Sequence, residues 1–128
     1  MPKINRYQDI SEIEKEAKKD YIDRHSPFVH VASSAKKGQP LTVKVKMGNE
    51  YPHPDDFDHY ISYVQLWDGE TLLGHASFPP GTLGNQAGHV EVNFNIVPKR
   101  NKLKLAGMSY CTKHGLWQGD TVELSVES

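Results

Sequence analysis

The stretch LTVKVKM, residues 41 to 47, decides the fold, because its apolar and polar side chains alternate with a period of two. This period is typical of a β-strand with one buried face. Similar strand-like runs occupy residues 28–33, 60–67, 71–78, 89–97, 102–110 and 121–126. Turn-forming segments such as DGE, PKRN and QGD separate them. About seven short strands with this punctuation predict an all-β, immunoglobulin-like antiparallel β-sandwich.

A short helix is predicted before the strands. Ser11 and Glu14 have the spacing of a capping box, and apolar residues recur at roughly helical spacing from Ile10 to Tyr21. We therefore expect a helix near residues 11–20. With 128 residues and a mass of 14.5 kDa, the chain is expected to form one domain, 1–128, in which residues 1–20 are an N-terminal extension.

Charge and hydropathy argue against several classes of partner. The chain has 15 basic and 16 acidic residues, a net charge of −1, and no basic tail that would indicate nucleic-acid binding. No apolar run approaches the roughly 20 residues that span a bilayer, and the segment MPKINRYQDI does not resemble a signal peptide. We expect a cytoplasmic protein with no nucleic-acid or membrane partner.

Cys111 is the only cysteine, so its thiol must be inert packing, a nucleophile or a metal ligand. It lies in SYCTKHGLW, residues 109–117, where His114 follows it and Gly115 is suited to a tight turn. A Cys-x-x-His pair could bind a metal on one side of such a turn. The alternative is a buried free cysteine near a surface histidine.

The stretch YPHPDDFDHY, residues 51–60, contains two further candidate ligands, His53 and His59. On a straight strand these histidines would be about 20 Å apart, and on a helix about 600° of rotation would separate them. The prolines and aspartates between them instead favour a compact turn that leads into a strand. Two exposed loop histidines are the alternative.

The chain has seven histidines, and His25 in YIDRHSPF, between the predicted helix and the first strand, is a third candidate ligand. His30, His75 and His89 have no companion ligand and are expected to be surface or packing residues. Several imidazoles and one thiolate exceed the tetrahedral set of structural zinc, and soft sulfur with several nitrogens suits iron or copper. Five protein ligands on iron would leave one octahedral position open.

Three segments resemble the superoxide reductases of the neelaredoxin and desulfoferrodoxin family. VKVKMGNEYPHPDDFDHYISYVQLW is similar to the family's G-x-E-x-P-H-P segment, MSYCTKHGLWQGDTVEL to its S-Y-C-x-x-H-G-L-W block, and DRHSPFV to a diverged E-K-H-x-P entry. The resemblance covers roughly residues 20–126. It implies the one-iron form, a single iron-binding superoxide reductase domain without a rubredoxin-like domain.

The resemblance also implies a ligand set and a reaction. Four equatorial imidazoles, with the Cys111 thiolate axial, would hold one mononuclear Fe(2+)/Fe(3+), and superoxide would bind opposite the sulfur. Superoxide would be reduced by one electron to hydrogen peroxide, with a donor such as rubredoxin restoring the iron. The family implies a homo-oligomer, with a tetramer as one form. The implied imidazole ligands are His25, His53, His59 and His114.

Two residues depart from the family pattern beside the first histidine. Asp23 and Arg24 stand where the family commonly has Glu-Lys. In the family the glutamate can bind oxidised iron, and the lysine attracts superoxide and organises water for protonation. Asp23 is one methylene shorter, whereas Arg24 keeps the charge on a planar, nontitrating head. Both are candidate catalytic residues, and the alternative is a solvated ion pair.

Other readings remain open at this point. The basic segment PKRNKLK, residues 98–104, is either an exposed hairpin turn or a docking patch for an acidic redox partner. Trp117 is expected in the core or as a wall that shields the iron, and Trp67 in the sandwich core. A cupredoxin-like electron-transfer protein is disfavoured because no methionine follows His114. A noncatalytic, metal-stabilised binding domain is a further alternative.

Overall fold

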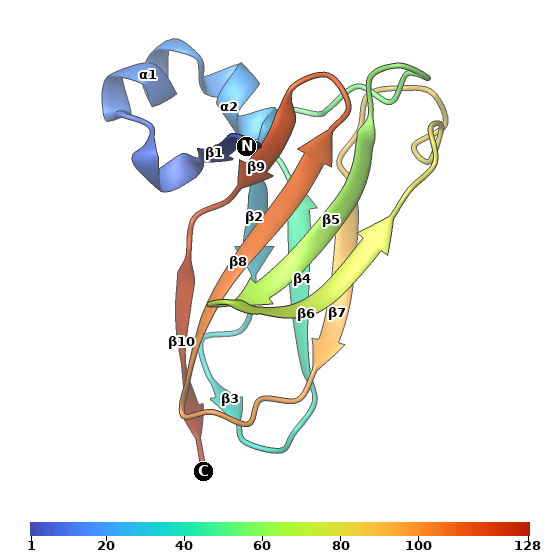
Figure 1. Cartoon of the computed structure of the whole chain (residues 1–128). Coiled ribbons are helices and arrows are strands. Elements are labelled where there is room, and N and C mark those ends of the chain that lie inside the picture. Colours follow the sequence, from blue (N-terminus) through green and yellow to red (C-terminus); the bar gives the residue numbers. More distant parts are fainter.

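The computed structural model describes residues 1–128, and two β-sheets form about half of it (Figure 1). The three-stranded sheet consists of β2 (Pro27–His30), β4 (Leu41–Met47) and β7 (Glu91–Ile96). The seven-stranded sheet consists of β1 (Ile4–Arg6), β3 (Ala35–Lys36), β5 (Ile61–Asp68), β6 (Thr71–Ser77), β8 (Lys102–Cys111), β9 (Gly115–Gln118) and β10 (Val122–Glu127). The expected all-β sandwich is confirmed.

The core lies between the sheets and follows the alternation seen in the sequence. In β4, which pairs antiparallel with β2 and β7, Leu41, Val43, Val45 and Met47 are all buried. In the other sheet, β8 pairs antiparallel with β5, β9 and β10. The buried apolar side chains of both sheets form one cluster of 13 residues, and Cys111 belongs to it. The thiol is therefore built into the end of the core.

All seven predicted strands are present, and three more strands were not predicted. β1 and β3 are only three and two residues long, too short for a periodic signal, and β9 follows immediately after the Cys-x-x-His turn. β1 pairs with β9 and β3 pairs with β10, both in parallel. The pairing is therefore parallel at these two edges, where short segments return from elsewhere in the chain, and antiparallel in the rest of the sandwich, as expected.

The predicted N-terminal helix is two helices. Ser11 caps α1 (Glu12–Ala17) by accepting a hydrogen bond from the Glu14 amide at 3.2 Å, as expected from the capping box. The chain bends at Lys18, and α2 (Lys19–His25) ends just before Ser26 and Pro27. The residue before a proline disfavours the helical region, which explains this end. His25 is thus the last residue of a helix, whereas the sequence suggested a connecting loop. A single 3₁₀ turn, η1 (Tyr7–Asp9), precedes α1.

Trp67 corrects another expectation. It alternates with the buried residues Leu66 and Asp68 on β5 and faces outward, half-buried, with its indole N–H donating to Gln65 at 2.9 Å. The register with β6 shifts between Leu66 and Trp67, so the strand carries an irregularity at this point. Trp67 is consequently outside the sandwich core.

Neither α1 nor α2 is long and apolar enough to cross a membrane.

Candidate metal centre

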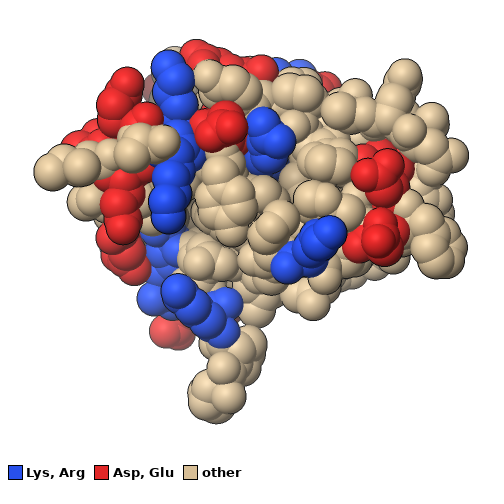
Figure 2. All heavy atoms as spheres, turned by 90° about the horizontal axis from the view of Figure 1, so that it is seen from above, with Lys and Arg blue, Asp and Glu red and all other residues tan.

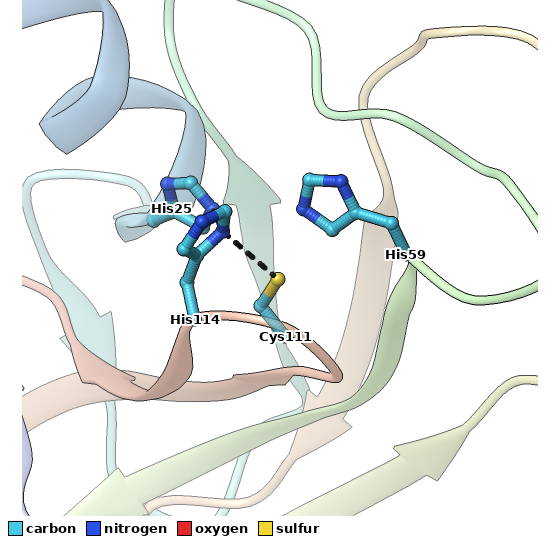
Figure 3. Close-up of side chains that lie close together, drawn as sticks. All are labelled: His25, His59, Cys111 and His114. Carbon is cyan, nitrogen blue, oxygen red and sulfur yellow. Dashed lines mark hydrogen bonds between the residues drawn. The ribbon is translucent and has the colours of Figure 1, made fainter.

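Four candidate ligands that are far apart in sequence meet at one end of the sandwich. His25 comes from the end of α2, His59 from the loop between β4 and β5, Cys111 from the end of β8 and His114 from the turn after β8. Figure 3 shows these four side chains pointing toward a shared space. One potential ligand atom from each lies within 4.8 Å of those of the other three. Such a group can bind one metal ion.

The fifth candidate, His53, completes a ring of imidazoles. Around the ring, neighbouring centroids are 4.9 Å apart for His25–His53, 4.9 Å for His53–His59, 5.0 Å for His59–His114 and 4.7 Å for His114–His25. Each of these neighbouring pairs is steeply inclined, by 70° to 86°. The opposite pair His25–His59 is 6.5 Å apart and nearly parallel, at 21°. We name this arrangement of four side chains the four-histidine ring.

The Cys111 thiol adjoins this ring. Its Sγ is 3.3 Å from Nε2 of His53 and 3.8 Å from Nδ1 of His114, and the residue is fully buried. Burial raises the pKa of the Cys111 thiol, whereas hydrogen bonds from the main chain of Lys113 and His114 oppose the rise. A thiol in this position favours its thiolate form when a cation is bound beside it.

The outward nitrogens of two imidazoles are already engaged. Nδ1 of His25 donates to the Tyr21 carbonyl, and Nδ1 of His53 donates to the Pro54 carbonyl, each at 2.7 Å. Because a carbonyl can only accept, these contacts place the ring proton on Nδ1 and leave the Nε2 lone pair directed into the cluster. There Nε2 of His25 lies 3.1 Å from Nδ1 of His114, and Nε2 of His53 lies 3.3 Å from Sγ of Cys111. Outer partners of this kind orient metal-binding histidines.

His59 provides the observation that tests whether a metal fits. Its Nε2 is buried and has no hydrogen-bond partner. Buried polar atoms are almost always paired, so an isolated one needs an explanation. Here the free nitrogen belongs to a group of nitrogens and one sulfur with ligand atoms close together. The donor set therefore fits a soft or borderline transition metal.

The protonation states agree with metal binding. Burial lowers the pKa of His25 to about 4. The neighbouring imidazoles lower this pKa further, whereas the hydrogen bond to the Tyr21 carbonyl raises it. The same causes lower the pKa of His53 to about 3. Burial also lowers the pKa of His59, and the charges of His114 and Lys113 lower it further. At neutral pH these imidazoles are uncharged, which is the form that binds metals.

A compact turn brings His53 and His59 together, as the sequence suggested. The amides of Asp56 and His59 donate to each other's carbonyls at 2.9 and 3.1 Å, which closes the turn. On the other side, His53 exchanges two main-chain hydrogen bonds with Gly88. Asp55 anchors this neighbouring loop by accepting from the amides at positions 81, 83 and 85. The sequence did not reveal this role of Asp55, because the loop lies far along the chain.

The turn after β8 positions the other two candidate ligands. Gly115 has φ +84°, a conformation that favours glycine, and it pairs with Cys111 as β9 folds back on β8. Thr112 ties the turn to the residue just before β5, because its amide donates to the Tyr60 carbonyl at 3.0 Å and its hydroxyl accepts from the Tyr60 amide at 3.1 Å. The thiol and the His114 imidazole are thereby brought to the same end of the core.

Two aromatic residues pack against one side of the four-histidine ring. Trp117 stacks on His25 with centroids 5.1 Å apart at 22°, and its indole N–H donates to the His114 carbonyl at 3.1 Å. Tyr21 contacts His25 at 4.7 Å and His114 at 5.3 Å. The sequence suggested Trp117 but missed Tyr21, whose signal was its position one helical turn before His25.

Asp23 and Arg24 lie beside the cluster, with their side chains engaged elsewhere. The Asp23 carboxylate accepts hydrogen bonds from the amides of Asn49, Glu50 and Tyr51. Arg24 folds back along α2, donating from Nε to the Asp20 carbonyl at 3.1 Å, with Nη2 3.8 Å from the Asp20 carboxylate. The two side chains do not form the ion pair considered as the alternative.

The remaining histidines lie outside the cluster. His30 contacts Asn49, His75 contacts Gln65 and Ser77, and the His89 ring contacts the Met47 carbonyl. These ordinary partners agree with the expectation that all three are surface or packing residues.

The basic segment 98–104 is at the far end of the sandwich. Lys102 begins β8 and Cys111 ends it, a separation of about 30 Å along an extended strand. Arg100 pairs with Asp68 at 3.7 Å, and Lys102 pairs with Glu123 at 3.0 Å. These positions favour the reading of an exposed turn over that of a docking patch close to the metal centre.

The end of the molecule above the cluster carries both signs of charge. In Figure 2, basic side chains gather in a band on the left with acidic ones on both sides of it, and two acidic groups lie on the right. An approaching anion therefore meets a mixed surface. Its attraction depends on the cations nearest the site, among which Lys113 is exposed in the turn between Cys111 and His114.

Comparison with known proteins finds similar sequences and structures. The superoxide reductase of Thermococcus kodakarensis is 32% identical over 104 residues, which cover 77% of this chain and 85% of that protein. The solved superoxide reductase (neelaredoxin) from Ignicoccus hospitalis superposes with a TM-score of 0.72 at 27% identity, covering 97% of this chain and 95% of that one. The reduced form of the Archaeoglobus fulgidus enzyme gives a TM-score of 0.62 at 30% identity, over 80% of this chain and 90% of that one.

The family itself is established by a sequence profile. The profile described as desulfoferrodoxin matches residues 12–120, a range that includes the four-histidine ring and Cys111. This match confirms the resemblance found in the three sequence segments. The chain belongs to the desulfoferrodoxin family.

Proposed function

We propose that this protein is a superoxide reductase that binds one iron ion through five side chains. The observation that carries the proposal is a ring of four imidazoles next to a single buried thiol. This set has more nitrogen ligands than the two-histidine, one-cysteine sites of blue copper proteins, and more ligands than structural zinc needs. The proposed ligands are His25, His53, His59, Cys111 and His114.

Bound iron would supply the ferrous–ferric couple for the reaction in which superoxide, one electron and two protons give hydrogen peroxide. The thiolate of Cys111 would donate electron density to the metal, as axial thiolates do in haem proteins. Tyr21 and Pro54 hold the His25 and His53 rings by their outward nitrogens. Trp117 and Tyr21 cover one side of the ring, which leaves less of the site open to water.

Lys113 lies between Cys111 and His114, and its positive charge lowers the pKa of both His59 and Cys111. A positive charge here favours the approach of a small anion.

We further propose that residues 1–128 act as one iron-binding domain within a homo-oligomer, a tetramer being the expected form. A small electron-transfer protein such as rubredoxin would re-reduce the iron.

The decisive experiment measures metal content, the visible spectrum and the products formed from superoxide. Protein purified without oxygen and loaded with ferrous iron is expected to hold one iron per chain. Each equivalent of superoxide should oxidise one iron and yield one hydrogen peroxide without releasing oxygen. Oxygen release, or iron that stays ferrous in the presence of superoxide, would contradict the proposal.

A further inference from the structure

The Asp23 carboxylate joins two segments that carry proposed ligands. Asp23 is in α2, two positions before His25, and its three hydrogen-bond donors are the amides of Asn49, Glu50 and Tyr51. These donors lie 26 to 28 positions further along the chain. The segment that supplies them leads directly into His53.

Both carboxylate oxygens are occupied by these contacts. Oδ1 accepts from Asn49 at 3.1 Å, and Oδ2 accepts from Glu50 at 3.0 Å and from Tyr51 at 2.8 Å. Successive main-chain N–H groups that converge on one anion form a concave anion-binding nest. Hydrogen bonds to an ionised acceptor are stronger than neutral ones. The carboxylate is therefore held by the loop, and three of its roughly four lone-pair sites are already used.

Gly48 lets the loop approach α2 closely. Its φ is +72°, and an added Cβ would lie 2.6 Å from the Tyr51 carbonyl oxygen and 3.2 Å from both Arg24 Cα and Asp23 Oδ2. Its amide donates to the Ser26 carbonyl at 3.0 Å. The loop thus lies against the main chain of α2 at the end that carries His25.

From these contacts we infer that Asp23 is a positioning residue that sets the distance between His25 and His53. The inference rests on the proposed function for the identity of the metal, but the contacts themselves involve only this chain. In this role the carboxylate stays bonded to residues 49–51 whether the iron is reduced or oxidised. Asp23 then differs from the family's glutamate, which can bind the oxidised metal.

The test compares Asp23→Asn with Asp20→Asn, a matched change on the exposed side of the same helix. In metal-free protein, Asp23→Asn should accelerate hydrogen exchange of the amides at positions 49, 50 and 51 at least tenfold. It should also shift the ring resonances of His25 and His53. Asp20→Asn should change neither. Unaltered exchange at the three amides, or equal effects of the two variants, would overturn the inference.

Metal binding provides a second measurement. A residue that only stabilised the fold would not selectively change the affinity for a metal ion. The affinity for Co(II), measured at a temperature where both variants are folded, should fall about 10- to 100-fold in Asp23→Asn and stay unchanged in Asp20→Asn. At full iron occupancy, the oxidised visible band of Asp23→Asn should match the original protein. A displaced band would show that Asp23 is a ligand. Failure of superoxide reduction alone would overturn the proposed function and leave the exchange and resonance tests valid.

Discussion

Cys111 is the chain's only thiol, and it contacts His53 and approaches His114. Changing Cys111 to serine removes the sulfur but keeps a small polar side chain. We expect Cys111→Ser to abolish the thiolate-to-iron band in the visible spectrum and to remove most superoxide reductase activity. His75→Ala, at an exposed histidine outside the cluster, should leave both near their original values. Equal effects of the two changes would contradict the ligand assignment.

Trp117 combines ring stacking on His25 with a hydrogen bond to the His114 carbonyl. Trp117→Phe keeps an aromatic ring but removes the N–H donor, and we expect a loss of about 1 kcal/mol in the free energy of unfolding. Trp117→Ala also removes the packing, with an expected loss of about 3–5 kcal/mol. Urea unfolding of the metal-free protein measures both. A phenylalanine variant as unstable as the alanine variant would show that stacking contributes little.

The strands could be predicted one by one from the sequence. The helix break and the spatial arrangement of the proposed ligands could not. β4 has its predicted limits because its alternation, LTVKVKM, is buried on one side. The break at Lys18 was not visible because the polar residues around it suit a helix and a turn equally well. The separate segments identified the five proposed ligands through family resemblance. Their ring geometry depends on contacts such as Asp55 with residue 83, which no local pattern encodes.

The loop from Gly48 to Tyr51 gives a prediction at the scale of one element. Gly48→Ala should lower the free energy of unfolding by about 2–4 kcal/mol, because it adds crowding against Tyr51 to the strain of a positive φ. Gly38 also has a positive φ, +79°, but nothing lies within 4 Å of an added Cβ. Gly38→Ala should therefore cost only about 1–2 kcal/mol. Chemical denaturation compares them, and similar losses would contradict the close packing of the loop on α2.

The buried imidazoles make the stability of the whole metal-free protein depend on pH. The pKa of folded His25 is about 4 and that of His53 about 3, both below the ordinary value of 6.5. The unfolded chain therefore binds more protons below pH 6.5, so stability is fully present above that pH and is lost as pH falls toward 4. At pH 5 the expected loss relative to pH 7.5 is about 2 kcal/mol for each histidine.

Denaturant unfolding of the metal-free protein at pH 7.5 and pH 5 measures this loss. Replacing His75 by glutamine, at an exposed position outside the cluster, serves as the control. Replacing His53 by glutamine should reduce it by about half, since one of the two strongly shifted groups is removed. Equal stability at the two pH values would contradict the burial of neutral imidazoles.

The spacing of the cluster along the chain has a consequence for biosynthesis. His25 and His114 are 89 positions apart, and Asn5 near the N-terminus donates to the carbonyl of Leu116, 111 positions away. A nascent chain emerging from the ribosome therefore carries three of the proposed ligands long before the last two, Cys111 and His114, are translated. Translation adds on the order of 5–20 residues per second, so these last ligands follow the third by seconds. Binding of a metal by the full proposed set is consequently a late step in maturation, and a chain that ends before Cys111 would lack two of the five proposed ligands.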